Sequence, residues 1–197
     1  MDPMGDRLMF RLAYRNFGTH ESIVLNHMAV ADAVTGQMGP RWYEVRDPGG
    51  TPTIFQQSTL GPSGSTDLYR FQGSIAMDRA GDIAIGYSTS SELAYPSIAY
   101  SGRLVTDPLN TLAQGEAQMF AGTGPQRGEL FAPQTGRWGD YSAMTVDPVD
   151  DCTFWFTTEY FEATDAPVGA WHTRVGSFKF PSCTPRPVGT LRGTITD

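Results

Sequence analysis

Hydrophobic and polar residues alternate along most of this 197-residue chain, in short runs that end at Gly, Pro, Asn or Asp. A period near two, carried by β-branched and aromatic residues, is typical of half-buried β-strands. The pattern contains no amphipathic helix longer than about two turns, so it predicts strands only. The predicted strands span residues 8–15, 21–30, 40–46, 52–58, 73–78, 82–89, 96–104, 115–121, 141–147, 152–159 and 171–180.

The strands fall into sets, because similar openings recur at nearly constant spacing. Gly5, Gly73 and Gly139 each come before a polar residue and an apolar strand, at intervals of 68 and 66 residues. Four antiparallel strands in a repeat of this length are typical of a β-propeller blade. We therefore predict an all-β fold of about three four-stranded antiparallel blades. A β-sandwich is the competing architecture, since the same strands also fill two sheets. The expected blades span about residues 5–61, 70–122 and 137–183.

Three blades are too few for a closed ring, because propellers typically use four to eight. A stack of three leaves two sheet faces uncovered. We predict a partial or self-completing propeller, in which two chains form a six-bladed homodimer. A clean monomer mass in light scattering at micromolar concentration would contradict this prediction.

Composition narrows the function classes. The chain has 14 Lys or Arg against 21 Asp or Glu, which gives a net charge of -7. Nucleic-acid binding needs clustered cations, so we expect no nucleic-acid partner. No apolar run approaches the roughly 20 residues of a membrane-spanning helix, so we expect no membrane span. The first residues lack the basic start and apolar stretch of an export signal.

Three stretches, residues 7–17, 73–78 and 137–155, resemble the C-terminal part of large secreted bacterial propeller proteins of the sialidase-like (BNR repeat) superfamily. The resemblance covers residues 5–181. It implies a secreted or cell-surface propeller that binds, and in some members hydrolyses, carbohydrate. The sequence departs from the sialidase Asp-box, roughly Ser-x-Asp-x-Gly-x-Thr-Trp, which only residues 77–81 and 145–147 echo.

The tail differs in character from the predicted blades. Residues 184–188 are Pro-rich and are typical of a stiff linker. Residues 189–197 resemble the first strand of a carboxypeptidase-regulatory-like sandwich domain, which is then truncated. We therefore expect the propeller blades to occupy residues 1–183 and a second domain to begin after the linker.

The propeller map gathers polar side chains at one rim of the central channel. Glycosidic acid/base chemistry needs two carboxyl groups about 5 to 9.5 Å apart, and carboxylates, tyrosines and arginines converge at this rim. The competing interpretation is that these acids cap turns or are simply solvated. The predicted catalytic residues are Asp6, Asp140, Tyr141 and Glu159, and the predicted substrate-binding residues are Arg7, Tyr95, Arg137, Trp138 and Trp171.

Carboxylate oxygens are also the ligands that Ca²⁺ prefers. A channel calcium that polarises a scissile carbonyl would make the protein a hydrolase of small esters or lactones. Asp147, Asp150 and Asp151 would offer a surface calcium site, although Asp in such turns more often accepts backbone hydrogen bonds. A further function class is a non-catalytic module that binds a protein partner.

The two cysteines, Cys152 and Cys183, flank strands that we expect to pair. Antiparallel neighbours place the start of one strand beside the end of the next, so the two sulfurs can meet. A disulfide suits a secreted protein, and closing a loop of about 30 residues stabilises by roughly 3 to 4 kcal/mol. Two buried thiols are the alternative.

The three histidines are too scattered for a zinc motif, and no nucleophile elbow or Walker loop is present.

Overall fold

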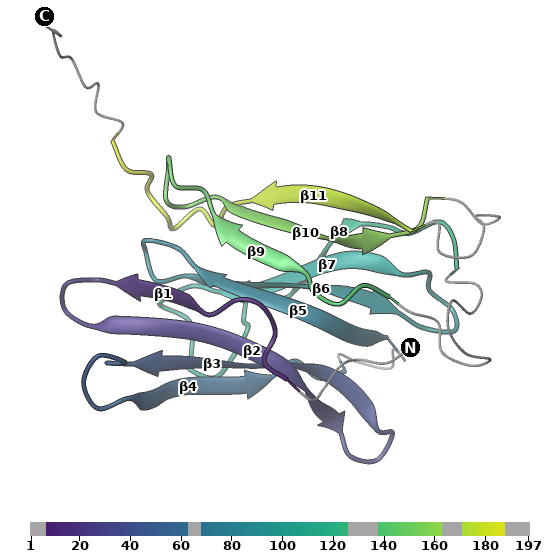
Figure 1. Cartoon of the computed structure of the whole chain (residues 1–197), viewed down its shortest axis with the longest axis horizontal. Helices are drawn as coiled ribbons and strands as arrows, with labels where there is room; N and C mark the ends of the chain where they lie inside the picture. The colour runs from purple at the N-terminus through teal and green to yellow at the C-terminus, as the bar shows by residue number, and fades with distance from the viewer. Residues whose placement is uncertain (1–6, 63–67, 126–137, 163–170, 188–197) are drawn as a thin grey trace, which may run out of the picture.

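The computed structural model describes residues 7–62, 68–125, 138–162 and 171–187, which form three antiparallel sheets (Figure 1). None of the three sheets closes on itself. The first sheet has the order β1 (Ala13–Asn16), β2 (Glu21–Asp32), β3 (Gln37–Arg46) and β4 (Thr53–Thr59). The second has the order β5 (Tyr69–Met77), β6 (Ile83–Ser90), β7 (Ser97–Arg103) and β8 (Glu116–Phe120). The third contains β9 (Ala143–Val146), β10 (Phe154–Tyr160) and β11 (His172–Phe178).

The all-β prediction is confirmed, and every predicted strand has a counterpart in the structure. The strands form three sheets rather than the two of a sandwich. The largest differences are at strand starts. The segment before β1 pairs only through an isolated bridge between Leu8 and His27, so β1 begins at Ala13. β5 begins four residues early, because a register shift lets the strand continue past Gln72, whose φ of 51° the pattern does not reveal.

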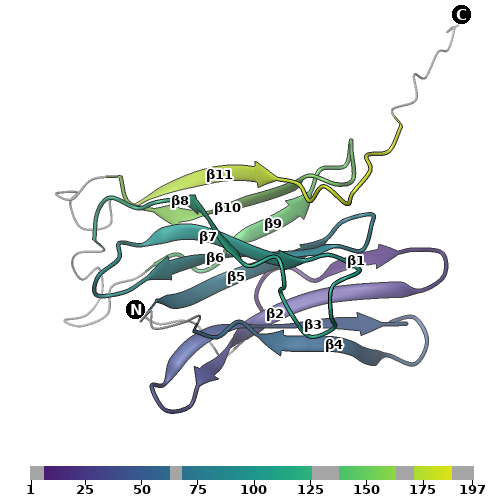
Figure 2. The same cartoon turned by 180° about the vertical axis from the view of Figure 1, so that it is seen from behind.

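The second sheet lies between the other two, as both views of the cartoon show (Figures 1 and 2). Its strands β5 and β6 are buried along almost their whole length, whereas β2 alternates between buried and partly exposed residues. A strand covered on both faces shows continuous burial, and a strand covered on one face alternates. The core is therefore two layers of side chains, one on each face of the middle sheet.

Each layer joins two sheets. Between the first and second sheets, Val24 and Trp42 pack in one cluster with Ile85 and Tyr87. Between the second and third sheets, residues such as Ala84 and Ile98 pack with the phenylalanines of β10. Gly86 is required here, since a Cβ at this position would lie 2.6 Å from the ring of Phe156. Side chains this close fix how the third sheet sits on the second.

Polar contacts also connect all three sheets. Arg15 of β1 donates from Nε to the carbonyl oxygen of Met77 in β5 at 3.0 Å. The same guanidinium donates two hydrogen bonds, of 2.7 and 3.1 Å, to the Asp151 carboxylate beside β10. Ser74 makes a similar link, because its Oγ donates to the Phe10 carbonyl and accepts from the Met144 amide. The first strands of the three sheets are thereby held side by side.

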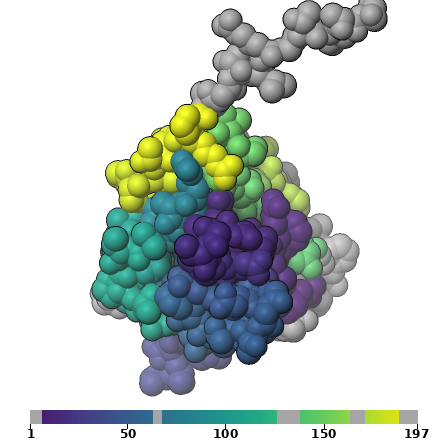
Figure 3. Space-filling view, turned by 90° about the vertical axis from the view of Figure 1, so that its left-hand side faces the viewer, coloured from purple at the N-terminus to yellow at the C-terminus, as the bar shows by residue number. Residues whose placement is uncertain are grey.

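The predicted disulfide between Cys152 and Cys183 is confirmed, with a Cα–Cα distance of 5.6 Å. It attaches the segment after β11 to the turn between β9 and β10. The end of the molecule that holds the disulfide also carries the β1–β2, β5–β6 and β9–β10 turns, and we call it the turn end. Figure 3 views the turn end, where the yellow C-terminal segment lies near the purple β1–β2 region. The opposite end, where β10 finishes, carries the candidate site.

Candidate carboxylate site

Glu159 is a buried carboxylate at the end of β10. Its side chain is 7% exposed, and burial raises its pKa because the ionised form loses water. A hydrogen bond of 3.0 Å from Thr158 Oγ1 to Oε2 works in the opposite direction. The negative charge of Asp140 raises the pKa further. Glu159 therefore holds a proton at a higher pH than an ordinary glutamate.

The Glu159 carboxylate lies directly against the backbone of Gly139. A Cβ at this glycine would be 2.2 Å from Glu159 Oε1, and its φ of 31° also favours glycine. Asp140, the next residue, is partly exposed and acts on Glu159 through its charge. Two of the residues predicted to be catalytic from the sequence thus lie in one electrostatic environment. One of them is buried and the other has access to solvent.

A set of hydrogen bonds holds the loop before β9 onto the second sheet. Gln72 donates from Nε2 to the carbonyl oxygens of Trp138 and Gly139, at 2.7 and 2.9 Å. Ser142 Oγ donates to the Gln72 carbonyl at 2.7 Å. Because the loop is fixed at both of its ends, the position of Asp140 is set by the second sheet. A site held in this way needs little rearrangement when a substrate binds.

Hydroxyl groups continue this network to Glu159. Trp138 donates from Nε1 to Ser88 Oγ at 3.2 Å, and Ser88 Oγ lies 3.3 Å from Thr158 Oγ1. Thr158 in turn donates to Glu159. Sequence reasoning did not select Ser88, Thr158 or Gln72. The sequence feature that could have identified them is a polar residue within a buried strand, because a buried polar side chain needs a hydrogen-bond partner.

Trp138 does not offer the exposed ring that we predicted for sugar binding. It is 2% exposed, and its indole packs against Phe71 and Phe161 at centroid distances of 6.2 and 5.7 Å. These two aromatic residues come from β5 and from the segment after β10, so the sequence alone does not place them together. Trp138 is instead a core residue next to the candidate site.

The other predicted catalytic and substrate-binding residues are placed as follows. Tyr141 is 46% exposed, and its hydroxyl accepts a hydrogen bond from Arg7 Nη1 at 3.5 Å. Tyr95 lies on the β6–β7 loop and Trp171 lies just before β11, and both side chains are exposed. Asp6 and Arg137 lie outside the described residues.

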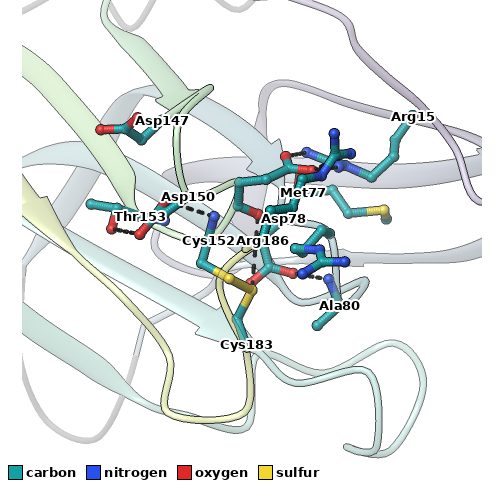
Figure 4. Close-up of polar contacts among 12 residues, drawn as sticks. Arg15, Met77, Asp78, Ala80, Asp147, Asp150, Cys152, Thr153, Cys183 and Arg186 are labelled. Atoms are coloured by element: carbon teal, nitrogen blue, oxygen red, sulfur yellow. Dashed lines mark hydrogen bonds and ion pairs between the residues drawn. A yellow bond between two sulfur atoms is a disulfide. The ribbon is translucent and has the colours of Figure 1, made fainter. Parts of the chain in front are cut away.

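The acids of the turn end accept hydrogen bonds from their own chain (Figure 4). Asp150 Oδ1 accepts from the amides of Cys152 and Thr153, each at 2.9 Å, and its Oδ2 accepts from the Thr153 hydroxyl at 2.6 Å. These bonds, the hydroxyl first, lower the pKa of Asp150 to about 2. Asp147 accepts from the Val149 amide and the Trp155 indole.

Asp151 is bound by two arginines. Its carboxylate lies 2.7 Å from a nitrogen of Arg15 and 2.7 Å from a nitrogen of Arg186. Burial alone would raise its pKa, but the hydrogen bond and the charges of these arginines lower it. In the part of the chain that the structure describes, no group of three His, Cys, Asp or Glu side chains is arranged to hold a metal ion. Asp147 and Asp150 thus make the contacts of turn-capping residues, whereas Asp151 makes ion pairs. Calcium binding at these three acids stays a prediction.

Comparisons with known proteins add no family to this description. A scan of protein-family models, a search of curated proteins and a search of solved structures each found no match to the chain. Across the described ranges, no helix is long and apolar enough to span a membrane. The function is therefore inferred from the residues of the site.

Proposed function

We propose that the chain is a sialidase-like β-propeller module that binds carbohydrate at the end carrying Glu159 and hydrolyses a glycosidic bond there. The observation that carries the proposal is the buried carboxyl group of Glu159, with its raised pKa, close to the charge of Asp140. Glycosidases use such a pair, with one carboxyl group protonated and the other ionised. The three stacked four- or three-stranded antiparallel sheets support the propeller assignment, as successive blades pack face to face.

In this proposal Glu159 is the general acid. Its proton moves to the glycosidic oxygen as the bond between that oxygen and the sugar carbon breaks, and the leaving oxygen keeps the electron pair. Asp140, whose side chain is partly exposed, stabilises the positive charge that develops on the sugar ring or activates the attacking water. Tyr141 and Arg7 are joined by a hydrogen bond beside Asp140 and orient the substrate.

We also propose that the protein is secreted and forms a homodimer. The disulfide supports a secreted or cell-surface location, since disulfides persist in oxidising compartments. The homodimer remains a prediction from blade number. It is supported by Leu8, Phe10 and Leu12, which are each about half exposed in the segment before β1. The light-scattering experiment described above tests it.

The experiment is a turnover assay with a panel of fluorogenic aryl glycosides. The wild-type protein is expected to release the aryl group from at least one substrate, and Glu159→Gln is expected to lower kcat at least 100-fold because the proton donor is lost. Glu162→Gln is the matched control, since this glutamate is at the same end but exposed, and it should keep full activity.

Thermal unfolding separates catalysis from folding. Glutamine keeps the size of Glu159 and removes a carboxyl group whose burial is unfavourable when ionised, so the variant should unfold at the same temperature as the wild type or higher. The proposal is contradicted if the wild type releases nothing from any glycoside in the panel. It is equally contradicted if a folded Glu159→Gln protein works as fast as the wild type.

A further inference from the structure

A pocket of about 450 Å³ opens beside the start of β5 and the end of β6. This volume is in the usual range for small-molecule sites. The pocket does not include Glu159 or Asp140. It is lined by Met38 from β3, by Tyr69 and Phe71 from β5, and by Ser90, Ser91 and Glu92 at the end of β6.

Strand register places this pocket next to the carboxylate site. Tyr69 pairs with Ser90, and Phe71 pairs with Ser88, so all four side chains are on one face of the second sheet. Ser88 belongs to the hydrogen-bond network of Glu159. Ser90 is two residues further along β6, which corresponds to about 7 Å along the strand. The pocket and the carboxylate site are thus within reach of one extended ligand.

The inner part of the pocket is formed by residues that are already packed or paired. Phe71 packs edge-on against Trp138, and the residue is 5% exposed. Arg70 also lines the pocket, and its guanidinium makes hydrogen bonds of 2.6 and 3.1 Å with the Glu116 carboxylate. Because this arginine is paired, the pocket does not select for anions. Its remaining charge is that of the exposed Glu92.

The lining offers an aromatic side chain and polar groups, which match the apolar face and the hydroxyl groups of a sugar ring. Tyr69 is 46% exposed and offers an aromatic surface for the apolar C–H face of a pyranose. The Glu92 carboxylate in the same lining can accept hydrogen bonds from sugar hydroxyl groups, and the Ser90 and Ser91 hydroxyls offer further polar partners. A purely apolar ligand would leave these polar groups unsatisfied.

We propose that this pocket binds one pyranose unit of a glycan whose scissile bond lies at Glu159. The proposal rests on the proposed function, because it takes the ligand to be the same carbohydrate. It assigns Tyr69 as the stacking residue and Glu92 as the hydroxyl acceptor. The pocket then determines which longer glycans are bound, while the carboxylates perform the chemistry.

The experiment measures binding to a printed array of oligosaccharides and turnover of monosaccharide aryl glycosides with the same proteins. Tyr69→Ala is expected to weaken array binding at least tenfold, and Glu92→Gln several-fold, while turnover of the small glycosides stays at the wild-type rate. Tyr14→Ala is the control, since this tyrosine is 55% exposed on β1, away from the pocket. Glu159→Gln should bind the array as the wild type does.

The outcomes separate the two proposals. Array binding by a wild type that hydrolyses nothing, with loss in Tyr69→Ala, supports the pocket and contradicts the proposed hydrolysis. Equal array binding by Tyr69→Ala and the wild type overturns the pocket proposal, as does the absence of array binding. The pocket proposal is also overturned if an apolar dye binds in the pocket and no oligosaccharide on the array displaces it.

Discussion

The two ends of the molecule use carboxylates in opposite ways. At the turn end, Asp150 and Asp151 accept hydrogen bonds from amides, a hydroxyl and arginines, and both pKa values are lowered. At the other end, Glu159 is buried near a second acid, and its pKa is raised. The difference lies in the donors that surround each carboxylate rather than in the residue type. A carboxylate whose oxygens are occupied by its own chain stabilises a turn, whereas a buried acid with few donors is suited to proton transfer.

Asp78 is the exception at the turn end, and it gives the largest expected effect. It is fully buried, and burial followed by the charge of Asp82 raises its pKa to about 7. The folded state therefore keeps a proton that the unfolded state loses near pH 4. The contribution of Asp78 to the free energy of unfolding is fully present below pH 4 and is lost as the pH rises through about 7.

We predict that urea unfolding of the wild type shows a decrease in stability between pH 5 and pH 8, of which Asp78 accounts for about 2 kcal/mol. Asp78→Asn removes the titrating group, and its amide oxygen still accepts from the Ala80 and Asp82 amides. The variant should lose that part of the pH dependence. An unchanged pH profile in Asp78→Asn would show that Asp78 ionises normally in the folded protein.

A smaller effect is expected from Asp151. Asp151→Asn removes the charge that pairs with Arg15, whose side chain is 18% exposed, and weakens the link between the first and third sheets. We predict a loss of about 1 kcal/mol at pH 7, measured by urea unfolding. Arg186→Ala should cost less, because that arginine is 60% exposed. An Asp151→Asn protein as stable as the wild type would mean that the ion pair does not hold the sheets together.

The sequence predicted the strands and the disulfide because both depend on local pattern and simple pairing. Alternation marks each strand, and antiparallel pairing brings Cys152 to Cys183. The start of β5 was missed, since the irregular backbone at Gln72 interrupts the alternation without ending the strand. The continuous burial of β5 and β6, polar residues included, reflects the two covered faces of the middle sheet, which only the packing of three sheets reveals.

The candidate site was predicted in part. Blade geometry placed Asp140 and Glu159 at the same rim, and the structure brings their charges together. The burial of Trp138 was not predictable, because Phe71 and Phe161 reach it from distant parts of the chain. The network of Gln72, Ser88 and Thr158 was missed for the same reason. Single residues in strands acquire partners only when the sheets are stacked.

The most direct test of the contrast between the two ends is a carboxyl-carbon NMR titration of the ¹³C-labelled protein. It follows Glu159 and Asp150 in one sample over the acid range. We predict a midpoint for Glu159 above the ordinary value of 4.5 and a midpoint for Asp150 of about 2. If Glu159 titrates at or below 4.5, it is not a protonated acid set apart from the turn carboxylates, and the proposed acid/base role is contradicted.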